Sequence, residues 1–187
     1  MKTLWMRVAF VTVLVGSVLA CSSSAAGGSG NGAASGGGGG SGGSPQWGVQ
    51  AKTSGCVAPG ALPDPGCTPG DILRDATKDK ICVSGYSSTV RNVPTSEKDA
   101  VYAEYGITHR ATGEYEVDHF VSLELGGSND ISNLWPEPAE PTPGFHQKDK
   151  VENYLHAQVC SGAMTLEEAQ RQIATNWLAV YDQMPNK

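Results

Sequence analysis

Four residues between positions 118 and 146 bring a carboxylate, two imidazoles and an amide into an order that could support chemistry. Asp118 and His119 are adjacent, Asn133 follows His119 by fourteen residues, and His146 follows Asn133 by thirteen. Carboxylate oxygens and imidazole nitrogens both bind divalent cations, and an imidazole can also accept a proton near neutral pH. If the fold brings these side chains together, they could hold one metal ion beside one general base.

The segments that carry these residues predict the order strand, loop, strand, helix. Residues 113–127 read as a strand that runs into a Gly-containing loop, with Val117 and Phe120 facing inwards. A hairpin of two strands would set His119 near Asn133. A helix folding across the hairpin would then present His146 towards Asp118.

The C-terminal part of the chain predicts two helices. The first begins after Gly144 and ends at Gly162, and the second begins at Thr165, where Glu168 completes a capping box. The apolar residues of both helices recur at helical spacing, which indicates core packing. They are Val151, Leu155, Val159, Leu166, Ala169, Ile173, Trp177 and Tyr181.

The segments before the hairpin carry weaker signals. Residues 48–71 are rich in turn formers, and residues 80–93 alternate in polarity around Gly85, which predicts one or two short strands. Residues 95–107 predict a short helix capped by Ser96 and Asp99. Its expected inner side carries Ala100, Val101 and Tyr105.

The stretch "VDHFVSLELGGSNDISNL", residues 117–134, resembles the HNH endonuclease family, with Asp118, His119, the Gly126–Gly127 loop and Asn133 at the expected separations. The resemblance implies an α+β fold with a ββα-metal (HNH-like) hairpin-plus-helix core, here with additional helices and two disulfides. Two features depart from the family pattern. A Pro-rich insertion separates Asn133 from His146, and the cysteine pairs that hold a structural zinc in many members are absent.

The resemblance also implies roles. His119 would be the general base, and Asp118 and His146 would bind the metal, with Asn153 as an alternative to His146. Asn133 would brace the hairpin and orient His119 through a side-chain hydrogen bond. The cofactor would be one divalent ion, magnesium or manganese, with zinc as an alternative. The implied reaction is metal-dependent phosphodiester hydrolysis of a nucleic acid, with DNA as the first expectation.

Each of these residues also has a plain structural interpretation. The adjacent Asp and His could form an exposed ion pair, Asn133 could be a turn residue, and His146 could start a helix without binding anything. Asp149 is a further rival of His146 on the same helix face. His109 and His156 have no partner at useful spacing, which favours surface or packing roles.

The first 46 residues have the composition of an export and anchoring segment. Residues 1–20 have basic residues near their start, then an apolar run, then small residues, as in a secretory signal peptide. "VLAC" resembles a bacterial lipobox, which predicts lipidation at Cys21 and attachment to a membrane of the cell envelope. The rest of residues 21–46 is almost entirely Gly, Ser and Ala, typical of a flexible linker. Residues 47–187 would form one HNH-like nuclease domain.

The net charge and the cysteines limit the functions and the compartments that fit this chain. The net charge of −6, which becomes −8 without Lys2 and Arg7, argues against tight nonspecific binding of nucleic acid. After Cys21 the chain has an even number of cysteines, which predicts two disulfides in an exported protein. Spacing favours Cys56 with Cys67 and Cys82 with Cys160, although sequence alone permits three pairings.

Two functions therefore remain open. The first is an HNH-type endonuclease that is exported and lipid-anchored, acts on nucleic acid, and shows no protein partner. The alternative is a non-catalytic envelope lipoprotein that uses the HNH-like scaffold for binding.

Overall fold

The computed structural model describes residues 45–185 and 187. The described residues all belong to one compact unit. The predicted signal peptide, Cys21 and nearly all of the predicted linker lie outside the described residues. Within the described part, no helix combines the length and apolar character needed to cross a membrane.

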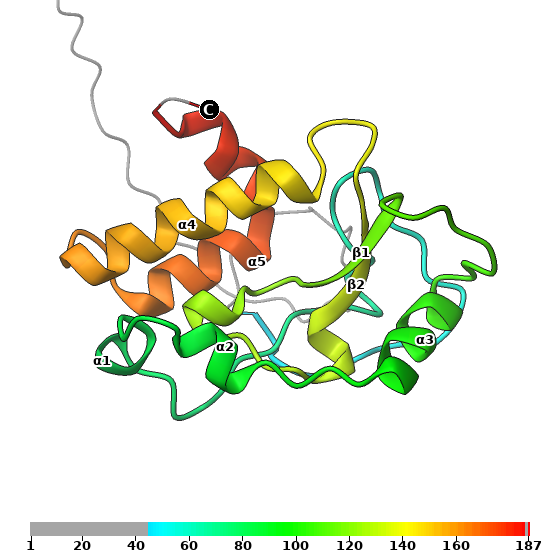
Figure 1. Cartoon of the computed structure of the whole chain (residues 1–187), viewed down its shortest axis with the longest axis horizontal. Helices are drawn as coiled ribbons and strands as arrows, with labels where there is room; N and C mark the ends of the chain where they lie inside the picture. The colour runs from blue at the N-terminus through cyan, green and yellow to red at the C-terminus, as the bar shows by residue number, and fades with distance from the viewer. Residues whose placement is uncertain (1–44, 186) are drawn as a thin grey trace, which may run out of the picture. The chain divides into compact units, whose positions relative to one another are not determined.

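A two-stranded antiparallel hairpin lies beside a helix pair (Figure 1). Strand β1 spans Tyr115–His119 and β2 spans Leu134–Pro138, with His119 opposite Leu134 and Tyr115 opposite Pro138. The connection contains two short 3₁₀ helices, η1 (Leu123–Leu125) and η2 (Ile131–Asn133). Helix α4 (Phe145–Ser161) follows β2, so the predicted order of strand, loop, strand and helix is confirmed.

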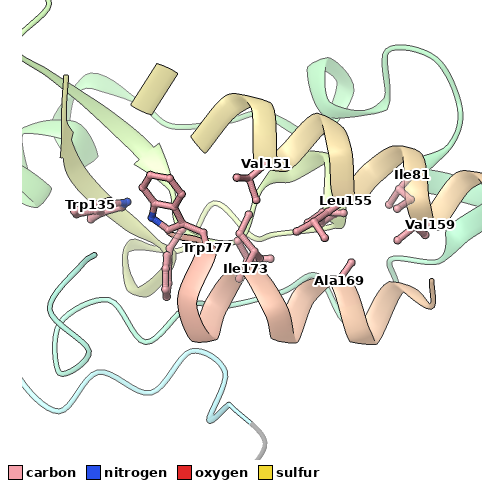
Figure 2. Packing of buried hydrophobic residues seen from close by; sticks show 11 residues of the cluster. Ile81, Trp135, Val151, Leu155, Val159, Ala169, Ile173 and Trp177 are labelled. Atoms are coloured by element: carbon pink, nitrogen blue, oxygen red, sulfur yellow. The ribbon is translucent and has the colours of Figure 1, made fainter. Parts of the chain in front are cut away.

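Helices α4 and α5 (Leu166–Gln183) lie side by side and provide most of the hydrophobic core (Figures 1 and 2). The Thr165 hydroxyl accepts a hydrogen bond from the Glu168 amide, and Gly162 adopts a left-handed conformation with φ of 85°, so both predicted helix boundaries are confirmed. The fully buried apolar residues of the two helices are Val151, Leu155, Val159, Ala169, Ile173 and Trp177. The spacing of the apolar residues thus predicted the core correctly, whereas Leu166 and Tyr181 lie at its margin.

The segment before the hairpin differs from the prediction. Residues 80–93 do not form strands; they contribute to two short helices, α1 (Lys78–Ile81) and α2 (Tyr86–Val90). The Thr77 side chain caps α1 by accepting from the Lys80 amide, and neither segment pairs with the described sheet. Local capping therefore decides this segment, because an alternating pattern without a partner strand gains no sheet hydrogen bonds.

Helix α3 (Thr95–Glu104) confirms the helix predicted for residues 95–107, but not its cap. Pro94 is the N-cap residue, so Ser96 lies inside the helix. The buried side also differs: Val101 and Tyr102 are buried, while Tyr105 is half-buried after the helix end.

Both favoured disulfides are present. Cys56 is bonded to Cys67, and Cys82 is bonded to Cys160 across 78 positions of sequence. The second bond ties the end of α1 to the last turn of α4. Short helices, a small antiparallel sheet and two disulfides together make this an α+β fold.

Candidate functional site

The loop after β1 depends on two glycines. Gly126 has φ of 73°, a conformation that glycine adopts at little cost. A Cβ atom on Gly127 would lie 1.8 Å from the Val121 carbonyl oxygen, which no side chain could tolerate. The Gly126–Gly127 pair therefore lets the loop fold back tightly against the end of β1.

Asn133 holds this loop together. Its side-chain Oδ1 accepts from the amides of Val121 (2.9 Å) and Asp71 (3.2 Å). Its Nδ2 donates to the carbonyls of Val121 (3.0 Å) and Ser128 (2.8 Å). Asn133 is fully buried, and its own carbonyl accepts from the amide of Phe120. The expected proximity to the end of β1 is present, and the side chain braces the loop.

The expected hydrogen bond from Asn133 to His119 is absent among the described residues. The side chain that contacts the imidazole is Asn129, whose Oδ1 lies 3.2 Å from His119 Nε2. Asn129 Nδ2 donates to the carbonyl of Val90, and Asn129 Oδ1 accepts from the amide of Asn92. Sequence reasoning missed Asn129 because these anchors come from a segment nearly forty residues earlier in the chain.

His119 is an uncharged imidazole at neutral pH. The residue is only 2% exposed, and burial lowers the pKa of His119 to about 4, although the nearby Asp118 carboxylate opposes the shift. Its Nδ1 atom has no hydrogen-bond partner in the described part of the chain. Nδ1 is also not fully enclosed by the surrounding protein. A proton acceptor is therefore available at this position.

Asp118 points to the other side of β1, towards α4. Its Oδ2 lies 2.6 Å from Lys148 Nζ, and the same ammonium donates to the carbonyl of His119 at 2.8 Å and contacts Glu152 Oε1. Successive strand residues face opposite sides, so Asp118 and His119 flank the end of the strand. Burial by itself raises the pKa of Asp118, but the Lys148 charge outweighs it, so the pKa is lowered and the group is ionised.

Sequence reasoning places Lys148 near the motif, either on a solvated face or in contact with phosphate, and so misses its buried position in the site. Lys148 is fully buried and lies on the inner face of α4, three residues before Val151. A lysine in register with a core stripe is the signal that could have identified it. Although burial disfavours its charge, the Asp118 and Glu152 carboxylates raise the pKa of Lys148 above its ordinary value.

Two further carboxyl groups surround this lysine. Glu137 on β2 is fully buried, lies 4.0 Å from Lys148 Nζ, and pairs with the Asp118 carboxylate through a side-chain hydrogen bond. Burial raises the pKa of Glu137 to about 10, so this carboxyl is protonated at neutral pH. Burial likewise raises the pKa of Glu152 to about 7, against the opposing charge of Lys148, and Ser122 donates to its second oxygen.

The protonated Glu137 carboxyl is a second hydrogen-bond partner of Asp118, and this bond helps to lower the pKa of Asp118. Acidic groups gather on this side. Burial raises the pKa of Glu116, and the charges of Asp118 and Asp149 raise it further. The pKa of Asp149 is also raised, first by burial and then by Asp118, while His146 acts in the opposite direction. Carboxylates that repel one another gain from a shared divalent cation. Among the described residues, however, the ligand atoms of these carboxylates do not all lie within 4.8 Å of one another.

The two predicted ligands on α4 lie on the outside of the helix. His146 is exposed and stacks against the ring of Phe145, with 4.3 Å between ring centroids. Asn153 is exposed and donates to the carbonyl of Asp149. Neither makes a hydrogen bond to Asp118 in the described part of the chain, so their role as ligands stays a prediction. The charge of Asp118 does act on Asp149, whose pKa it raises.

A different group, Cys82, His156 and Cys160, has three potential ligand atoms close enough to share an ion. The two sulfurs form a disulfide, and His156 Nε2 lies 3.0 Å from the carbonyl of Ile81. A carbonyl only accepts, so this nitrogen carries a proton and offers no lone pair. These contacts assign the group to structure rather than to metal binding.

The cavities of the described residues lie away from Asp118 and His119. The one between α4 and α5 has a volume of about 540 Å³ and contains none of the site residues. Comparisons of the chain with protein-family models, with curated proteins and with solved structures found no match.

Proposed function

We propose that this protein is a metal-dependent endonuclease of the HNH type that hydrolyses phosphodiester bonds in nucleic acid. One juxtaposition carries the proposal. At the end of β1, an ionised Asp118 lies beside other carboxyl groups, and the adjacent His119 is a neutral imidazole with an unpartnered Nδ1.

His119 is suited to remove a proton from an attacking water. A base that is neutral at pH 7 can accept a proton, and burial keeps this imidazole neutral. Lys148 donates to Asp118 Oδ2, which holds the carboxylate in a single orientation. Asp118, with a further ligand from His146 or Asp149 on α4, would hold the cation. That ion would neutralise the charge that develops on the phosphate and on the leaving oxygen.

Arg91 supports a phosphate-containing substrate. It is exposed, forms no ion pair within the described residues, and lies within electrostatic range of both Glu116 and His119. A guanidinium in this position could hold a phosphate by two parallel hydrogen bonds. Arg91 thus places one positive charge near His119 despite the acidic chain.

One observation favours a second function, in which the same scaffold binds without catalysis. The Lys148 ammonium already neutralises part of the Asp118 charge and so competes with a metal ion for it. The export segment and the lipid anchor at Cys21, which remain proposals, are compatible with either function.

Cleavage assays with the purified, disulfide-bonded protein test the proposal. Plasmid DNA and RNA are incubated with magnesium, manganese or EDTA, using the unchanged protein, His119→Ala, and His109→Ala as an exposed control. We expect metal-dependent cleavage that falls by about 10²–10⁴-fold in His119→Ala and stays unchanged in His109→Ala. A folded protein that cuts neither substrate with either metal would reject the nuclease and favour the binding function.

A further inference from the structure

We infer that Asn129 is a positioning residue that fixes His119 as the Nε2–H tautomer and leaves Nδ1 as the nitrogen that accepts a proton. The assignment of Nδ1 as the catalytic base rests on the proposed nuclease function. The assignment of the tautomer rests on hydrogen bonds alone.

The first step is the orientation of the Asn129 amide. Its Nδ2 lies 2.8 Å from the carbonyl oxygen of Val90, which can only accept. Its Oδ1 lies 3.0 Å from the main-chain nitrogen of Asn92, which can only donate. Turning the amide over would oppose donor to donor at Asn92 and acceptor to acceptor at Val90. Two independent main-chain anchors therefore select one orientation.

The second step carries this orientation to the imidazole. The Asn129 atom that faces His119 Nε2 is Oδ1, at 3.2 Å, and an amide oxygen has no proton to give. The Nε2 atom must therefore be the donor. A neutral imidazole has one ring proton, so Nδ1 bears the lone pair. This is the ring nitrogen that has no partner among the described residues.

The third step concerns the origin of the anchors. Val90 ends α2, and Asn92 follows in the connection to α3, whereas Asn129 belongs to the loop between η1 and η2. The imidazole orientation is thus set by contacts between the loop of the hairpin and a segment 37 to 39 positions away. A substitution in that segment could therefore change the orientation of the His119 imidazole without contacting it.

The test reads the tautomer directly. The full chain is labelled with ¹⁵N-histidine, and two-bond ¹H–¹⁵N correlation spectra are recorded at pH 8, where the imidazole is neutral. We expect His119 to show a protonated Nε2 and an unprotonated Nδ1. We expect Asn129→Ala to give mixed tautomers, whereas Asn92→Ala, which keeps the main-chain donor, leaves the pattern unchanged. An Nδ1–H tautomer in the unchanged protein, or an unaltered pattern in Asn129→Ala, overturns the inference.

Activity provides a separate measurement. Asn129→Ala should lower kcat by about 10–100-fold with KM nearly unchanged, and Asn92→Ala should match the unchanged protein. If Asn129→Ala does not fold, Asn129→Asp takes its place; it keeps an acceptor for Nε2–H and should keep the tautomer, and loss of the tautomer there overturns the inference. If the unchanged protein shows the expected tautomer but cuts no nucleic acid, the nuclease proposal fails while the role of Asn129 in fixing the tautomer stands.

Discussion

At the scale of single residues, the site depends on a buried lysine surrounded by acidic groups. Lys148 contacts Asp118 and Glu152 and donates to the His119 carbonyl, so one ammonium group connects β1 to α4. Its side chain is 1% exposed, and those of Asp118 and Glu152 are 18% and 15% exposed. Removing one partner from such a cluster leaves a buried charge unpaired, which strongly destabilises the fold. This loss is much larger than the stability that the intact pair adds compared with apolar residues in the same place.

Lys148→Met should destabilise the protein by about 3–5 kcal/mol, because it leaves the Asp118 carboxylate and its acidic neighbours unpaired. The free energy of unfolding is measured by urea denaturation of the disulfide-bonded protein at pH 7. Lys150→Met provides a matched control, since Lys150 is exposed on the same helix, and it should change stability by less than about 0.5 kcal/mol. Equal effects of the two substitutions would show that the buried lysine does not compensate these carboxylates.

At the scale of elements, helix α4 connects the site to the rest of the fold. Its N-terminal half carries Lys148 and Asp149, its inner face packs on α5, and its last turn is bonded to the end of α1 through Cys82–Cys160. Gly144 allows the helix to start close to β2, because a Cβ there would lie 2.4 Å from the carbonyl oxygen of Pro138. The position of α4 relative to the hairpin therefore sets the distance between Asp118 and its partners.

Removing the long-range disulfide should cost more than removing the short one. On the chain-entropy relation, Cys82–Cys160 with a separation of 78 contributes about 4 kcal/mol, and Cys56–Cys67 with a separation of 11 contributes about 3 kcal/mol. Each pair is replaced by alanine, and guanidinium unfolding gives the two losses. The reverse order would mean that packing around Cys56–Cys67, rather than loop closure, determines the contribution of the disulfides.

At the scale of the whole molecule, the buried carboxyls link global stability to pH. Burial raises the pKa of Glu137 to about 10, compared with about 4.5 for the same group when exposed. A group whose pKa is raised by folding stabilises the protein fully below its unfolded pKa, and that contribution is lost as pH rises through the folded pKa. The Glu137 contribution therefore decreases from about pH 4.5 up to about pH 10.

Glu137→Gln should remove this dependence, because the amide has nearly the same shape and does not titrate. Relative to the unchanged protein, the variant should gain stability as pH rises from 5 to 9, by at least about 1.4 kcal/mol, the equivalent of one pKa unit. The measurement is the difference in the free energy of unfolding at several pH values. Glu140→Gln, at an exposed position in the segment after β2, is the control and should show no such trend. A constant difference across the range would contradict the assignment of a protonated Glu137.

The sequence by itself determined what depends on neighbouring residues. Helical spacing of apolar residues, the Thr165 cap and the Gly162 end predicted α4 and α5, and the position of Asp118 and His119 before a Gly-rich loop predicted a hairpin. The short loop between Cys56 and Cys67 favoured the observed disulfide pairing, although sequence alone permitted three pairings. These signals are local, because caps, turns and side-chain periodicity act over a few residues.

Only the tertiary structure decided which side chains meet at the site. Lys148 reaches Asp118 across thirty positions, and Asn129 owes its orientation to Val90 and Asn92. Residues 80–93 contribute to helices, the first of them capped by the nearby Thr77, while a strand would have needed a distant partner that the described sheet does not supply. Partners far apart in sequence are brought together by packing of the whole chain. Burial, which sets the pKa of His119 and Glu137, arises in the same way.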